Sequence, residues 1–173
     1  AAEPGVAAAL GALWTQPPPA GAFTLTATIA AARAYNTECV RGLSGVDPEY
    51  LHGSCPKTLR GLAPGMPVIV RRNINIARRW VNGTQARISA FSDACVILVR
   101  DDGEKIGVSP MPRFDSPREV EYPFSLGFAS TVHSLQGCTM TEPYVIDDSI
   151  LRAAFNPYTL FLVAASISTR RQS

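Results

Sequence analysis

Hydrophobic and polar positions alternate in the first clearly patterned part of the chain and then change to a helical spacing. Residues 23–28 read Phe-Thr-Leu-Thr-Ala-Thr, an alternation of apolar and hydroxyl side chains that predicts a β-strand. Residues 29–43 follow with many alanines and with Arg33, Asn36 and Glu38 at helical spacing. Together these residues predict one strand followed by one helix.

Short apolar runs separated by turn residues fill the middle of the chain. Residues 44–60 are interrupted by glycine and proline and predict a loop. Strands are then predicted at 67–71, 84–90, 94–100 and 105–109. Asp101-Asp102-Gly103 between the last two strands is a hairpin signal. Several short strands with closely spaced turns predict a small β-barrel.

The remaining segments predict isolated elements. Residues 5–14 form a helix-capable, alanine-rich piece that stops before three consecutive prolines. Residues 110–117 predict a proline-bearing connection, residues 119–124 and 143–147 predict strands, and residues 155–168 predict a loop followed by an apolar helix. Because the chain opens within a helical pattern without an initiator methionine, we expect it to be cut or processed from a longer protein.

Composition bounds these predictions only loosely. The chain has 173 residues, 46% of them hydrophobic, which is enough to bury a core in one domain or two small ones. A net charge of +2 does not by itself indicate nucleic acid, so any basic surface must come from local clustering. The densest cluster joins Arg71, Arg72, Arg78 and Arg79 to Trp80. Two interpretations stay open: a groove for a nucleic-acid strand, or a solvated charged hairpin with Trp80 in the barrel core.

Cysteine and histidine spacing predicts no metal site. The four cysteines contain no Cys-x-x-Cys pair, and the two histidines lie far apart, so free thiols in a reducing compartment are expected. The chain has neither an apolar run of about 18 residues nor a charged secretory leader. We therefore expect no membrane partner and an intracellular location, in the nucleus or cytoplasm, and in the host cell if the protein is viral.

Residues 122–140 combine features that occur together nowhere else in the chain. An apolar run precedes a histidine, several hydroxyl side chains and a Gln-Gly pair. This concentration of donors and acceptors suits a phosphate-rich ligand. The alternative is a buried strand followed by a helix N-terminus whose hydroxyls satisfy one another.

The wording of this segment, Y-P-F-S-L-G-F-A-S-T-V-H-S-L-Q-G-C-T, resembles the motif F-P-L-x-x-A-x-T-I-H-K-S-Q-G-x-T of superfamily 1B helicases of the RecD and Pif type. Ser134 and Leu135 replace the lysine and serine of that motif. The resemblance implies that Thr131, His133 and Ser134 face a nucleic-acid backbone, whereas Gln136 and Gly137 face a nucleotide cleft. For His133, a satisfied core histidine is the alternative.

Two further segments are similar to the same family. Residues 65–84 match the segment that introduces an SH3-like insertion in the second motor domain, and residues 26–36 match the opening strand and helix of that domain. The resemblance implies nucleic-acid contacts for Asn36, Arg72, Asn73, Asn82 and Thr84. An ordinary position on a solvated helix face is the alternative for Asn36.

The final family motif departs from the pattern. Val163, Ala164 and Ser166 match, but Ile167 stands where the family has an arginine that reaches the γ-phosphate. Loss of such an arginine is expected to cost about 10³-fold or more in turnover. Arg170 is a candidate substitute if the register slips.

The phosphate-binding half of a motor is missing from the sequence. No G-x-x-x-x-G-K-[ST] segment occurs, and no predicted strand ends in an Asp-Glu pair. We expect this chain alone to bind no cofactor, and ATP and Mg²⁺ to be used only with an N-terminal RecA-like lobe, in the same protein or in a partner subunit.

The resemblance implies an α/β fold, namely a RecA-like (P-loop NTPase-type) second helicase domain interrupted by a small SH3-like β-barrel. The implied parts are an N-terminal piece (1–20), the first part of domain 2A (21–60), the barrel insertion 2B (61–117) and the remainder of 2A (118–173). The implied function is the C-terminal part of an ATP-dependent helicase that moves 5′ to 3′ on single-stranded DNA. A non-catalytic interaction or scaffold module that has lost ATPase function is the alternative.

Overall fold

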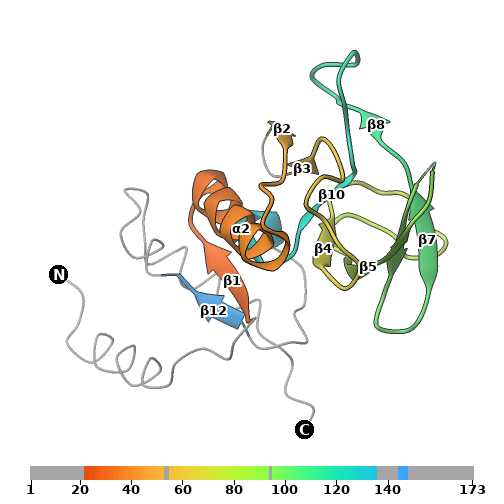
Figure 1. Ribbon diagram of the computed structural model, residues 1–173. Helices are drawn as coiled ribbons and strands as arrows, with labels where there is room; N and C mark the ends of the chain where they lie inside the picture. Colours follow the sequence, from red (N-terminus) through yellow and green to blue (C-terminus); the bar gives the residue numbers. More distant parts are fainter. Residues whose placement is uncertain (1–21, 53–54, 94, 136–143, 148–173) are drawn as a thin grey trace, which may run out of the picture.

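A computed structural model describes residues 22–52, 55–93, 95–135 and 144–147. In these residues the chain forms a mixed α/β fold with one parallel sheet, one larger antiparallel sheet and two short hairpins. Figure 1 shows the long helix α2 beside β1 of the parallel sheet. The helices predicted at 5–14 and within 155–168 lie outside the described residues.

The parallel sheet is built around the predicted strand–helix unit. Strand β1 (Phe23–Thr26) lies between β11 (Ala129–Thr131) and β12 (Tyr144–Ile146), and both neighbours run parallel to it. Helix α2 (Ile29–Ser44) follows β1 and packs against β1 and β11. Thr28 caps its first turn by accepting a hydrogen bond from the Ala31 backbone, and Gly45 ends it with a left-handed φ of 71°. Within the described ranges, no helix is long and apolar enough to cross a membrane.

The antiparallel sheet confirms the four strands predicted in the middle of the chain. They are β4 (Pro67–Val70), β5 (Gln85–Phe91), β6 (Val96–Val99) and β7 (Lys105–Val108), and β10 (Phe124–Leu126) pairs with β4 as a fifth strand. The domain boundaries expected from the sequence place β10 in residues 118–173, after the insertion at residues 61–117. Pairing runs in the order β10-β4-β5-β6-β7, and in the described part of the chain no pairing joins β7 to β10. Backbone hydrogen bonds therefore leave this sheet open.

Two short hairpins extend the fold. Strands β2 (Tyr50–His52) and β3 (Cys55–Pro56) pair within the segment predicted as a loop. Strand β8 (Met111–Pro112), in the predicted return connection, pairs with β9 (Val120–Glu121), which is the part of the predicted strand 119–124 that forms before β10. Proline and glycine in these segments keep the pairing to two or three residues per strand.

Strand β4 joins the hydrophobic cores of the two sheets. Val68 and Val70 pack in the core of the antiparallel sheet together with Trp80, which is 0% exposed. Ile69 points to the opposite face and packs with Leu25 in the core of the parallel sheet. Successive side chains of a strand alternate between faces, so one four-residue strand serves both cores. Trp80 therefore lies in the hydrophobic core of the antiparallel sheet, whereas the closed barrel expected around it is not observed in the described residues.

The chain crosses from the antiparallel to the parallel sheet at Gly127. The Gly127 N–H donates to the carbonyl of Pro67 at 2.7 Å. A Cβ atom at Gly127 would lie 2.8 Å from the Pro67 carbonyl carbon and 2.9 Å from the Val68 nitrogen. Both atoms belong to backbone, which cannot rotate away. This close approach explains why glycine stands between β10 and β11.

Candidate nucleic-acid interface

Two polar segments meet at one edge of the parallel sheet. Because β1 and β11 run parallel, their carboxyl ends, Thr26 and Thr131, lie at the same edge and in register. The Val132 N–H donates to the Thr26 carbonyl at 3.1 Å and holds the two chain ends together. Ligands of open α/β sheets bind outside the carboxyl ends of the strands. This edge is therefore the first candidate site.

The 3₁₀ turn η1 (His133–Leu135) follows β11 and is fixed at two points. The Thr131 Oγ1 lies 2.7 Å from the Ser134 Oγ and accepts a hydrogen bond from the Ser134 backbone at 3.2 Å. Leu135 is 0% exposed and packs in the same core as Leu25. These contacts give a physical reason for Ser134 and Leu135, the two departures from the helicase motif. Ser134 hydrogen-bonds to Thr131 at the start of the turn, and Leu135 packs the turn against the core.

The surface that η1 presents is centred on His133. Its side chain is exposed and has no hydrogen-bond partner among the described residues, so the core-histidine alternative is wrong. Ser134 is half-buried, whereas Thr131 is only 6% exposed. A ligand at this edge would therefore meet the His133 imidazole and the Ser134 hydroxyl, with Thr131 behind them.

The first turn of α2 adds a favourable field at the same edge. Thr28 satisfies the Ala31 N–H, and the first turn carries no acidic residue that would neutralise the positive end of the helix dipole. Backbone N–H groups at a helix N-terminus attract phosphate and other anions. Because only two residues separate the end of β1 from the start of α2, this turn lies on the side of the sheet edge where η1 begins.

Asn36 acts on this edge from inside the molecule. Its side chain is 0% exposed, which excludes the solvated-face alternative. The Asn36 Oδ1 accepts hydrogen bonds from the backbone of Phe128 (3.1 Å) and Ala129 (2.9 Å), and its Nδ2 donates to the Ala129 carbonyl at 2.9 Å. In this structure Asn36 therefore positions the start of β11 and has no exposed atom to offer a ligand.

The residues predicted from the second motif lie in the connection between β4 and β5, where several of them build local structure. The Asn73 Oδ1 accepts a hydrogen bond from the Asn82 backbone at 3.0 Å. The Thr84 hydroxyl accepts from Val81 at 3.1 Å and donates to the carbonyl of Arg79 at 3.2 Å. Asn73 and Asn82 are exposed, and their contact with nucleic acid stays a prediction.

The basic cluster does not form an aromatic groove around Trp80. The Arg78 Nε donates to Glu104 at 2.6 Å and its Nη2 donates to the Lys105 carbonyl at 2.8 Å. Arg100 lies over the buried Trp80 ring, with its guanidinium carbon 5.1 Å from the ring centroid. Arg78 is thus paired within the hairpin and Trp80 is buried, so neither belongs to an open aromatic groove in this structure.

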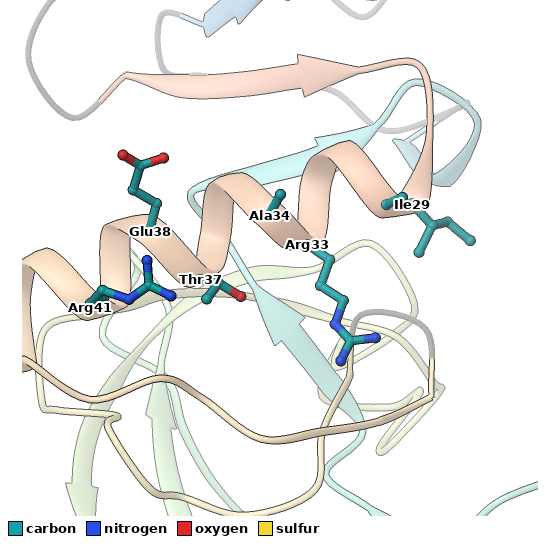
Figure 2. A pocket seen from close by; sticks show the side chains of 7 residues that line it. Ile29, Arg33, Ala34, Thr37, Glu38 and Arg41 are labelled. Atoms are coloured by element: carbon teal, nitrogen blue, oxygen red, sulfur yellow. The ribbon is translucent and has the colours of Figure 1, made fainter.

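A surface depression of about 630 Å³ lies along α2 and reaches its first turn, where Ile29 and Ala30 line it. Figure 2 shows its lining, in which the Arg33 and Glu38 side chains point to different sides of the helix. Its lining residues among those described all come from α2, and none of them is a predicted site residue. A single helix cannot surround a ligand, so we assign no binding role to this depression.

No metal cluster or disulfide forms in the part of the chain that the structure describes. It contains no group of three or more potential metal ligands, and Cys39, Cys55 and Cys95 are free. Burial raises the pKa of the Cys55 thiol to about 12 and also raises the pKa of Cys39. Gln136, Gly137 and Arg170 lie outside the described residues, so their predicted roles stay predictions.

Solved structures of Pif1 helicases resemble this fold. Pif1 helicase from Candida albicans aligns with a TM-score of 0.60 at 20% identity, over 97% of this chain and 48% of that one. Pif1 helicase from Bacteroides in complex with ADP-AlF3 and ssDNA aligns with a TM-score of 0.59 at 17% identity, over 89% of this chain and 40% of that one. No protein-family model and no curated protein sequence matches the chain.

These likenesses show the fold: a mixed α/β domain with a parallel sheet like that of Pif1 helicases. The chain spans 37% to 49% of the length of the first Pif1 structures it matches. It therefore corresponds to less than half of each of those proteins.

Proposed function

We propose that the chain is the C-terminal part of an ATP-dependent DNA helicase of superfamily 1B, of the RecD and Pif type. In this proposal it supplies half of the track for single-stranded DNA and half of the ATP cleft. The observation that carries the proposal is the polar edge of the parallel sheet, where His133 is exposed beyond β11 in a Pif1-like fold.

The chemistry of this edge suits a nucleic-acid backbone. The His133 imidazole, the Ser134 hydroxyl and free N–H groups of the first turn of α2 all donate to phosphate oxygens without reading a base. Two related Bacteroides Pif1 structures contain ssDNA, one of them together with ADP-AlF3. We assign single-stranded DNA as the ligand of this edge by analogy with them.

The proposal divides the remaining roles as follows. Gln136 and Gly137 face the nucleotide, and Arg170 is the candidate for the arginine that reaches the γ-phosphate. Residues 61–117 form an SH3-like insertion, which β10 extends from the segment that follows. ATP and Mg²⁺ bind together with an N-terminal RecA-like lobe, and the assembled enzyme moves 5′ to 3′.

A non-catalytic scaffold is the second candidate, and Ile167 in place of the family arginine favours it. Measurement of DNA-stimulated ATP hydrolysis by the full-length protein separates the two. The helicase proposal predicts hydrolysis that rises when single-stranded DNA is added. Absence of hydrolysis in a full-length protein with an intact phosphate-loop lobe would support the scaffold.

The binding role of the edge is tested by His133→Ala in this chain. We expect its affinity for a fluorescent oligo-dT strand to fall about two- to tenfold, because one hydrogen bond to phosphate is lost. Leu43→Ala is the control, since Leu43 is 66% exposed near the opposite end of α2. Equal affinities for both variants would remove His133 from the interface.

A further inference from the structure

The loop that joins β8 to β9 presents an isolated aromatic ring. Figure 1 shows this loop projecting away from both sheets. The Phe114 side chain within it is 91% exposed, more than any other large hydrophobic side chain among the described residues. The guanidinium carbon of Arg72 lies 4.1 Å from the centroid of the ring. Arg72 therefore covers one face of the ring, and the other face is open to solvent.

Arg72 is itself held in place, so the ring has a defined orientation. The Arg72 Nη1 donates to the carbonyl of Pro112 at 2.7 Å, at the end of β8. The hairpin continues beyond its strands through a hydrogen bond from the Arg113 N–H to the Glu119 carbonyl at 3.0 Å. An aromatic side chain that is ordered before a ligand arrives loses little conformational entropy on binding.

Two arginines of this region are not paired with carboxylates in the described part of the chain and are therefore available to bind an anion. Arg113 is bound to two of the loop carboxylates, Asp115 and Glu119. Within the described residues, Arg72 and Arg118 have no carboxylate partner. The acidic groups of the loop are thus engaged by Arg113, whereas Arg72 and Arg118 remain free to meet an anion.

The size of the apolar surface favours a planar ligand. The immediate loop neighbours of Phe114, Arg113 and Asp115, are charged, and the exposed apolar side chains near it in sequence are Pro112, Pro117 and Val120, which is 46% exposed. A stable protein interface buries about 1,000 Å² or more, which one ring and three smaller side chains do not provide. A nucleobase needs only one flat aromatic surface, and its phosphate needs a nearby cation.

We propose that Phe114, backed by Arg72, is a base-stacking platform for single-stranded nucleic acid, separate from the edge at His133. A base packs on the open face of the ring, and the adjoining phosphate meets Arg118. The platform rests on the proposed function, because it is a second contact for the same ligand. Stacking reads no sequence, so the platform accepts any base.

The test uses the full chain and a fluorescent oligo-dT strand at one low salt concentration. We expect Phe114→Ala to weaken binding about 5- to 150-fold, the range for loss of one stacked base. Phe114→Tyr keeps an aromatic ring and should keep the wild-type affinity. Ile76→Ala is the control, since Ile76 is also highly exposed (71%) but has no aromatic ring. Both side chains are exposed, so the three variants should fold.

Each outcome decides between the platform and the sheet edge. If Phe114→Ala lowers the affinity for the oligonucleotide and His133→Ala does not, the platform is supported and the sheet edge at His133 is excluded as a binding site. Weakening by His133→Ala alone overturns the platform and leaves the proposed function standing, with Phe114 then a contact for protein. Equal losses in Phe114→Ala and Phe114→Tyr overturn stacking, because tyrosine retains the ring. Absence of any binding by the wild-type chain overturns both.

Discussion

Replacement of Asn36 by alanine tests how the fold positions the polar edge. The buried Asn36 side chain makes three hydrogen bonds of 2.9 to 3.1 Å to the backbone of Phe128 and Ala129. Each such bond contributes about 0.5–1.5 kcal/mol, and backbone groups left buried without a partner add to the loss. We therefore expect Asn36→Ala to lower the free energy of unfolding by about 3 kcal/mol.

Urea unfolding followed by circular dichroism measures this change. Glu38→Ala is the matched control, because Glu38 is exposed on the same helix and its loss should change stability by at most about 0.5 kcal/mol. Native-state hydrogen exchange adds a local readout, since the amides of Phe128 and Ala129 should lose protection in Asn36→Ala. A loss below about 1 kcal/mol, or unchanged protection of the Ala129 amide, would refute the positioning role.

Three further predictions follow from the same geometry. Gly127→Ala should lower the free energy of unfolding by about 1–3 kcal/mol because its Cβ meets backbone. Gly42→Ala, at a helical position with nothing within 4 Å, should raise it by about 0.5–1 kcal/mol, and equal stabilities of these two variants would contradict the account. Trp80→Phe should lower the free energy of unfolding by about 1–3 kcal/mol and leave the affinity for an oligonucleotide unchanged, because Trp80 is buried. A variant of unchanged stability that binds the oligonucleotide more weakly would show instead that Trp80 contacts nucleic acid. Burial raises the pKa of Cys55 from 9.0 and of Tyr50 from 10.0, each to about 12, so the free energy of unfolding should fall as pH rises from about 9 to 12. Cys55→Ala should reduce that fall, and a pH-independent urea midpoint over this range would show that neither group is protected.

Local patterns in the sequence were sufficient for the regular elements. The alternation at 23–28 and the helical spacing that follows correspond to β1 and α2, because strands and helices repeat with different periods. The alternation did not mark an exposed face of β1, since Thr24 and Thr26 are 5% and 0% exposed. The hairpin predicted at Asp101-Asp102-Gly103 joins β6 to β7, with Gly103 at a φ of 83°. Glycine accepts this left-handed conformation without steric cost.

Features that depend on pairing between distant segments were missed. The pairing of β10 with β4 could not be predicted, because the residues of β10 are buried on both faces and show no alternation that would indicate their partner. Asn36 was predicted at a nucleic-acid surface, although it lies four residues from both Ala32 and Val40 on the buried face of α2. That spacing was the available signal, since a polar residue within a buried stripe must find partners inside the fold.

Phe114 also went unnoticed in the sequence. A single aromatic residue within a short proline-bearing connection has no periodicity, so burial patterns cannot predict whether it is exposed. Its relation to Arg72 depends on the pairing of β8 with β9 and on the Arg72–Pro112 hydrogen bond, which joins positions 40 residues apart.

Binding of a fluorescent single-stranded oligonucleotide to this chain across a series of salt concentrations tests the central claim most directly. If the sheet edge holds nucleic-acid phosphates, the logarithm of the binding constant should fall linearly with the logarithm of salt, with a slope of about −0.7 for each phosphate contacted. His133→Ala should bind more weakly than the wild-type chain at every salt concentration. Absence of binding at low salt, or an affinity that salt does not change, would contradict the claim.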